Sequence, residues 1–144
     1  MVAAAFEECR RPEHFTDHTH CCECAEHDAL LRSRNRDTLT VADVGNPGWD
    51  PICFVTNEGF AYYFPALARL ALTEPTGRHA WYLEQLLFHL NDEDRPQKRR
   101  SACSPRQREA VVCFLQHVLE ARQRLLHDYL CEAELLAKIG LWAK

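Results

Sequence analysis

The sequence predicts a mainly α-helical protein with a single domain, and three observations support this fold class. Apolar residues recur at intervals of three and four over much of the chain after Thr56, which is the spacing of one helix face. A strong helix-start signal begins at Ser104, and no Gly or Pro follows Pro105 until Gly140. The 144 residues suffice for one domain, 1–144, with its own core. At most a minor strand is expected, near residues 52–55.

The first third of the chain is less regular. Residues 1–20 contain Pro12 and many polar side chains without a period, so we expect an irregular lead-in that carries candidate metal ligands. A first helix is predicted from about Cys22 to Arg34, because basic residues suit a helix C-terminus. A loop rich in Pro and Gly follows. The run "ICFVT" is then either a buried strand or an extended entry to the next helix.

The middle of the chain predicts two more helical segments. Thr56 is a candidate N-cap for the first. Pro65 lies inside this segment and removes an amide donor, so we expect either a kink or two short helices. The second segment spans about Arg78 to Leu90 and has one apolar face. The stretch "NDEDRPQKRRSAC" that follows is interpreted as a charged, solvated loop.

The C-terminal helix has the clearest start. Ser104, Pro105 and Gln107 supply an N-cap, a first-turn proline and the partner residue of a capping box. The helical segment covers residues 104–139, and an unbroken helix of about 30 residues within it would reach about 45 Å. Because its distal half is rich in apolar residues, we expect it either to fold back after a break near His127 or to pair with a second chain. We favour the homodimer.

Two segments resemble a known family. The stretch "NEGFAYYFPALARLAL" followed by "SPRQREAVVCFLQHVLE" is similar to small bacterial domains of unknown function, which have a "YYFPA"-like motif before a helix that begins "SPxQRxAV". The resemblance covers roughly residues 49–119. It implies a small, largely helical intracellular domain and carries no assigned reaction or catalytic residue.

Composition narrows the class of protein further. No run of apolar residues is long enough for a membrane span, and the N-terminus does not resemble a secretory signal, so we expect a cytoplasmic protein without membrane contact. In that compartment the eight cysteines stay reduced and suit metal binding, redox chemistry or core packing. The net charge of −4 makes nucleic acid an unlikely partner.

The stretch "HCCECAEHD", residues 20–28, is the strongest candidate site. Cys21-x-x-Cys24-x-x-His27 has spacing that suits zinc, with a fourth ligand drawn from His14, His18, His20 or Cys9. On one straight helix Cys21 and His27 would lie too far apart to share an ion, so we expect Cys21 in the turn before the helix.

A second arrangement places His20, Cys24 and His27 on one helix face, so Cys24 and His27 are common to both arrangements. The same face could instead pack inward as core, because free cysteine is often buried. A thiol redox pair is a third interpretation, but no strand with a thioredoxin-like pattern precedes the segment.

These observations favour a zinc-stabilised, non-catalytic binding or regulatory module. Two alternatives remain. The first is a metal-dependent enzyme in which Glu23 or Glu26 acts as a base beside an open zinc position. The second is a metal-free protein-interaction domain of an immunity-like or assembly-forming kind. A closed site with four ligands would favour a structural role, and three ligands plus water would favour catalysis.

Overall fold

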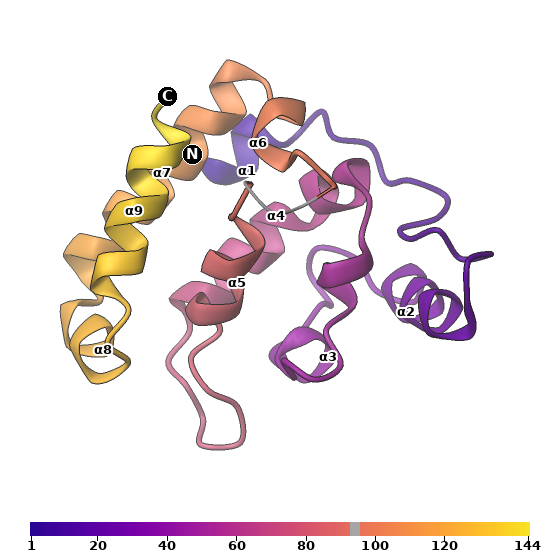
Figure 1. Cartoon of the computed structure of the whole chain (residues 1–144), viewed down its shortest axis with the longest axis horizontal. Coiled ribbons are helices and arrows are strands. Elements are labelled where there is room, and N and C mark those ends of the chain that lie inside the picture. Colours follow the sequence, from indigo (N-terminus) through magenta and orange to yellow (C-terminus); the bar gives the residue numbers. More distant parts are fainter. Residues whose placement is uncertain (93–95) are drawn as a thin grey trace.

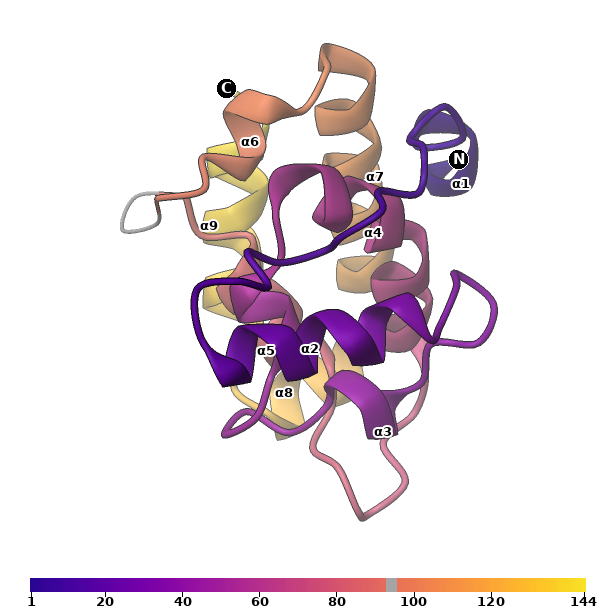
Figure 2. The same ribbon diagram turned by 90° about the vertical axis from the view of Figure 1, so that its right-hand side faces the viewer.

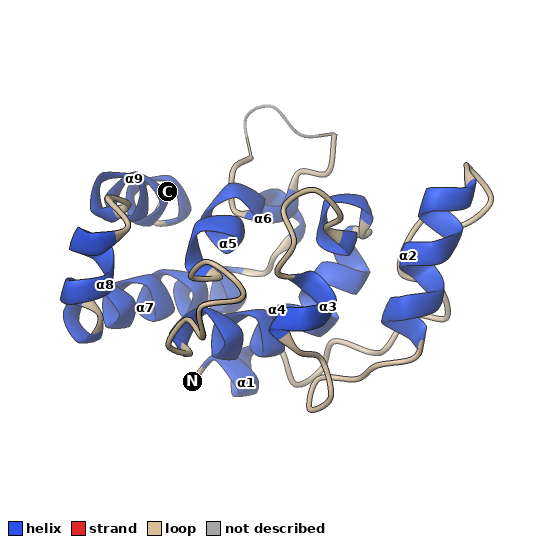
Figure 3. Cartoon of the chain, turned by 90° about the horizontal axis from the view of Figure 1, so that it is seen from below, coloured by secondary structure: helices blue, strands red, loops and turns tan. Residues whose placement is uncertain are grey.

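The computed structural model describes residues 1–92 and 96–144, and helices joined by turns and loops make up its architecture (Figure 1). The mainly α-helical prediction is confirmed, and no β-strand occurs among the described residues (Figure 3). The elements are α1 (Val2–Ala5), α2 (Cys22–Arg32), α3 (Val41–Val44), a 3-10 helix η1 (Pro51–Phe54), α4 (Asn57–Leu72), α5 (Leu83–His89), α6 (Arg99–Ala102), α7 (Pro105–Ala121), α8 (Gln123–Asp128) and α9 (Glu132–Trp142).

The strand predicted near residues 52–55 is instead a short 3-10 helix followed by one extended residue. The Asp50 carboxylate accepts a hydrogen bond from the Ile52 amide at 2.9 Å and caps this helix, with Pro51 in its first turn. Val55 is extended and forms an isolated β-bridge with Thr16. The cap at Asp50 therefore favours a 3-10 turn over residues 51–54, although the composition of this segment is typical of a strand.

Helix α4 runs unbroken through Pro65, so of the two alternatives the two short helices are wrong and the kink stays a prediction. Its N-cap is the predicted one, because the Thr56 hydroxyl accepts a hydrogen bond from the Gly59 amide at 3.1 Å. Residues on both sides of the proline, including Phe60 and Leu67, are buried in the same core. This shared packing offsets the one backbone hydrogen bond that the proline removes.

Helix α5 is shorter than the predicted Arg78–Leu90 segment because it begins only at Leu83. The apolar face is nevertheless buried as expected, and Trp81 just before the helix is also buried. The Trp81 indole donates a hydrogen bond to the Ala71 carbonyl at 2.8 Å, which ties this segment to the end of α4. Part of the charged loop after α5, residues 93–95, lies outside the described residues.

The helical segment predicted over residues 104–139 is divided into α7, α8 and α9. The capping box at Ser104 and Gln107 is confirmed, but α7 ends at Ala121. There the Arg122 guanidinium donates hydrogen bonds of 3.0 and 3.2 Å to the Leu72 carbonyl at the end of α4. A contact fifty residues away in sequence therefore helps to end the helix.

Beyond this break the chain folds back. Leu130 adopts a positive φ of 54° between α8 and α9, and α9 packs along α7 (Figure 1). Leu135 and Trp142 of α9 are fully buried, and the Trp142 indole donates a hydrogen bond to the Leu90 carbonyl at 2.9 Å. Much of the apolar surface that suggested pairing is thus covered by the chain itself. The homodimer stays a prediction.

The lead-in, residues 1–20, is irregular after α1 but is anchored to the domain. Phe6 and Phe15 are fully buried in the core. The Phe15 carbonyl accepts a hydrogen bond from the Thr56 amide at 2.8 Å. The lead-in then runs beside α2, at the opposite end of the molecule from α8 and α9 (Figures 1 and 3).

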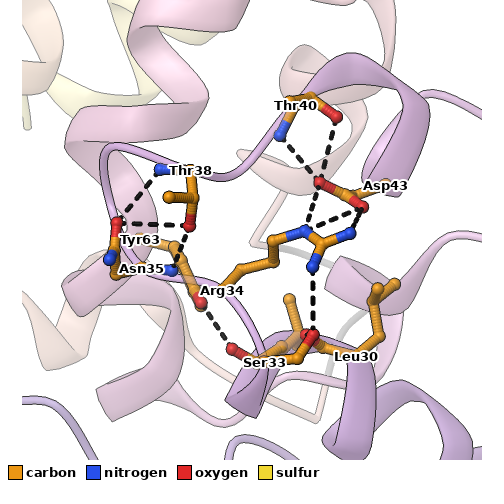
Figure 4. Close-up of polar contacts among 9 residues, drawn as sticks. Leu30, Ser33, Arg34, Asn35, Thr38, Thr40, Asp43 and Tyr63 are labelled. Atoms are coloured by element: carbon orange, nitrogen blue, oxygen red, sulfur yellow. Dashed lines mark hydrogen bonds and ion pairs between the residues drawn. The ribbon is translucent and has the colours of Figure 1, made fainter.

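An ion pair connects α2 to α3 (Figure 4). The Arg34 guanidinium lies 3.1 Å from the Asp43 carboxylate, which also accepts a hydrogen bond from the Thr40 amide at 2.9 Å and so caps α3. Burial alone would raise the pKa of Asp43, but the bonds from Arg34 and Thr40 outweigh it and lower that pKa below its usual value. The loop after α2 is therefore held in one path toward η1.

Among the described residues, no helix is both long and apolar enough to cross a membrane.

Candidate metal centre

Helix α2 begins where the cysteine motif predicts. Cys21 is the N-cap residue, with an extended backbone, and its sulfur accepts a hydrogen bond from the Cys24 amide at 3.4 Å. Glu23 lies in the first turn and Arg32 in the last, so both charges match the helix dipole. The expected placement of Cys21 in the turn before the helix is confirmed.

The lead-in lies along α2 and is attached to it by hydrogen bonds (Figure 2). The Asp28 carboxylate accepts bonds from the Phe15 amide at 2.6 Å and the Thr16 amide at 3.2 Å. One turn earlier, the Thr16 hydroxyl donates to the Cys24 carbonyl at 2.7 Å. These bonds place the lead-in histidines next to the first two turns of α2.

Three predicted ligands meet at the N-terminus of α2. The sulfur atoms of Cys21 and Cys24 lie 3.3 Å apart, and the Cys24 sulfur lies 3.8 Å from Nδ1 of His20. All three ligand atoms lie within 4.8 Å of one another. Cys24 is buried, whereas Cys21 and His20 are exposed, so the cluster opens to solvent on one side.

The protonation of the two thiols differs. Hydrogen bonds from the Cys24 amide, from His20 and from the Cys24 thiol lower the pKa of Cys21 to about 7. The Cys24 thiol keeps its proton in the bond to Cys21, and this bond together with burial raises its pKa to about 11. The bond to Cys21 also raises the pKa of His20. A cation bound to both sulfur atoms would displace the proton that lies between them.

His27 lies apart from this cluster. Its ring is fully buried and packs between Trp49 and Phe54, with ring centroids 4.7 and 4.9 Å away. Nε2 lies 3.4 Å from the Glu23 carboxylate, and Nδ1 is buried without a hydrogen-bond partner among residues 1–92 and 96–144. The structure therefore gives His27 a packing position and does not bring it to Cys21 or Cys24.

The other proposed ligands fall in different places. His14 and His18 form a second group with Asp28, which is separate from the His20 group. The Cys9 sulfur accepts a hydrogen bond from the side chain of Gln107, in the first turn of α7, at 3.1 Å. Sequence reasoning missed Asp28 as a ligand, although its position four residues after Cys24 on the same helix face was a usable signal.

The charge of this region favours a cation. Residues 12–31 contain five carboxylates, four histidines and no Lys or Arg. Burial would raise the pKa of Asp28, but hydrogen bonds from His14 and from two backbone amides outweigh it and lower that pKa below its usual value. The region therefore places carboxylates next to nitrogen and sulfur ligand atoms.

A third group, formed by Asp50, Cys53 and His89, is better explained as part of the core. Asp50 accepts hydrogen bonds from the Ile52 amide and the Gln85 side chain, and lies 2.6 Å from Nε2 of His89. The nearby Arg99 guanidinium is also buried, where it donates to the carbonyls of Ile52 and His89. The recorded partners of the Asp50 carboxylate are therefore side chains and an amide of the core itself. Sequence reasoning placed Arg99 in a solvated loop, which the structure corrects.

A cleft of about 540 Å³ lies between the lead-in and helices α4, α6 and α7. Its lining includes Arg10, Asn57 and Phe60, but none of His20, Cys21 and Cys24. The three ligands of the His20 group therefore lie outside this cleft, whereas Cys9 lines it.

Comparison with known proteins gives a family and no activity. No curated protein and no solved structure is detectably similar to the chain. A family model described as a family of unknown function, DUF6714, matches residues 1–143, so the match includes the lead-in and α2 as well as the two segments that carried the resemblance. The chain belongs to this family of unknown function.

Proposed function

We propose that the chain binds one zinc ion through His20, Cys21 and Cys24, and that the ion stabilises a non-catalytic binding or regulatory module. The convergence of one imidazole nitrogen and two sulfurs within 4.8 Å carries this proposal. Two thiols and an imidazole are the ligands that zinc prefers, whereas magnesium and calcium require oxygen ligands.

The position of the cluster suggests what the ion would do. His20 belongs to the lead-in, Cys21 caps α2, and Cys24 lies in the first turn of α2. An ion bound by all three residues would connect the lead-in to α2. The lead-in and α2 are otherwise connected here by the hydrogen bonds of Thr16 to Asp28 and Cys24. Metal binding would then contribute directly to the folding free energy of this end of the domain.

The enzyme alternative has one observation in its favour, because three side-chain ligands leave a fourth coordination position for water. Two observations favour a binding role. The Glu23 carboxylate lies next to His27, and the cleft described above is not lined by the three ligands. We therefore favour a site that stabilises the domain over one that activates water.

Metal analysis of freshly purified protein tests the proposal. We expect zinc at this cluster in the purified chain, so Cys24→Ser should contain about one equivalent less than the wild type. Cys22→Ser is the matched control, since Cys22 is an exposed neighbour outside the cluster, and it should keep the zinc. A protein with no zinc above background, whose melting temperature is unchanged by added zinc, would refute the proposal.

Chelation should then loosen one end of the molecule first. At a free zinc concentration one hundred times the dissociation constant, the ion would add about 2.7 kcal/mol to stability. In hydrogen exchange, residues 13–31 should lose protection before α7 and α9 when zinc is removed. A uniform loss of protection would contradict a local role for the ion.

A further inference from the structure

A second cluster of ligand atoms lies one turn further along α2. His14 and His18 come from the lead-in, and Asp28 comes from the helix. Nδ1 of His14 lies 2.7 Å from Oδ2 of Asp28, and one ligand atom from each of the three residues lies within 4.8 Å of the others. The two imidazole rings are stacked, with centroids 3.7 Å apart and planes only 9° from parallel.

Asp28 is held as a ligand would be. Its side chain is only 4% exposed, and its Oδ1 accepts hydrogen bonds from the amides of Phe15 and Thr16. These bonds fix the orientation of the carboxylate and leave Oδ2 facing His14. Such backbone support is typical of carboxylates that bind metals, because the outer bonds orient the ligand.

An ion pair between His14 and Asp28 does not account for His18. Within residues 1–92 and 96–144, His18 makes no hydrogen bond, and its ring stacks on the ring of His14. The His18 ring is thus held beside His14 and the fixed Asp28 carboxylate without a role that the ion pair explains, and coordination of a cation would supply one.

We propose that His14, His18 and Asp28 form a second metal site, separate from the first, for a divalent transition-metal ion such as Zn²⁺. Two imidazole nitrogens and one carboxylate oxygen match the preferences of zinc and neighbouring transition metals. One carboxylate is too few oxygen ligands for a calcium site.

The two sites share no ligand, so the second proposal does not depend on the first. Cys24 and Asp28 are four residues apart on α2, which corresponds to about 6 Å along the helix axis. His14 is 32% exposed, so an ion and its remaining water ligands can reach the site. Both sites lie in the stretch without Lys or Arg, where the five carboxylates favour a second positive ion.

Titration of the metal-free full-length chain with Zn²⁺ tests the second site. Calorimetry should detect two equivalents of bound zinc in the wild type, and His18→Ala should lose one of them. Because His18 makes no hydrogen bond in the described residues, this variant removes a ligand without removing a support of the fold. His127→Ala, an exposed histidine on α8, is the matched control and should bind two.

The Cys24→Ser variant separates the two proposals. It should still bind one zinc, and added Zn²⁺ should shift the NMR signals of the His14 and His18 rings. Loss of zinc from His18→Ala but not from Cys24→Ser would support the second site and refute the first. The second site is refuted if His18→Ala binds as much zinc as the wild type, or if Zn²⁺ leaves the signals of both rings unchanged in Cys24→Ser.

Discussion

The α2 end and the α7–α9 end lie at opposite ends of the longest axis of the molecule and are held by different interactions (Figure 1). At the α2 end, an irregular lead-in is attached through polar contacts such as those between Thr16 and the turns of α2. At the other end, α9 is held against α7 and the core by buried apolar residues, including Leu135 and Trp142. The first end gathers ligand atoms, and the second supplies core.

Because of this difference, we expect the two ends to contribute differently to stability and to metal binding. Apolar packing is strong without any ligand, because burial of a large side chain stabilises by roughly 1.5–3 kcal/mol. Polar attachments add less, about 1 kcal/mol for a typical hydrogen bond. A bound ion would therefore add most to the links between the lead-in and α2 that are made by hydrogen bonds. Substitutions at the two ends should have separable effects on stability and on zinc content.

Trp142→Ala should have the largest effect on stability. The side chain is 1% exposed and its indole is hydrogen-bonded to the Leu90 carbonyl, so we expect a loss of about 3–5 kcal/mol in urea unfolding. The folded variant should keep its zinc. Leu136→Ala, on the same helix but 48% exposed, is the control and should cost no more than about 1 kcal/mol. Equal losses of stability in both variants would indicate that exposed Leu136 is also buried, and would support pairing of this segment with a second chain.

His27→Ala tests the comparison at the α2 end. Removal of a fully buried ring between Trp49 and Phe54 leaves a cavity, so we expect a loss of roughly 2–4 kcal/mol. Zinc content measured on the folded variant should not change, because His27 lies outside the cluster. His117→Ala, exposed on α7, should change neither quantity. Zinc loss in His27→Ala would show that His27 is a ligand after all.

Asp43→Asn should have the smallest effect, and that effect should depend on pH. The pKa of Asp43 is lowered in the folded state, so its contribution is present above its ordinary pKa of about 3.9 and is lost as the pH falls through the lower folded value. At neutral pH we expect a loss on the order of 1 kcal/mol, since the exposed Arg34 partner weakens the ion pair.

Urea unfolding of both proteins from pH 7 to pH 2.5 would show this dependence. The stability difference between wild type and Asp43→Asn should narrow below about pH 4. Asp37→Asn is the control, because Asp37 is exposed in the same loop and accepts no side-chain hydrogen bond within the described residues. A difference that stays constant down to pH 2.5 would argue against the ion pair.

Local features of the fold were predictable from the sequence. The starts of α2, α4 and α7 depend on caps at Cys21, Thr56 and Ser104, each of which bonds to an amide three residues later. Such contacts lie within one turn, so the sequence nearby determines them. The predicted break near His127 is confirmed by the end of α8 at Asp128, where the chain folds back. The earlier break after α7 was not predicted, because the Arg122 side chain bonds to a carbonyl fifty residues away.

In the candidate site, too, some features follow from the local sequence and others from tertiary contacts. The sequence by itself determined the dense ligand stretch and the meeting of Cys21 with Cys24, because a capping residue and the third helical residue are always close. Only the tertiary structure decided that His27 packs against Trp49 and Phe54. It also decided that Asp28 faces His14, because this contact requires the lead-in to lie along α2. The hydrogen bonds that hold it there join residues far apart in the sequence, so no local pattern predicts them.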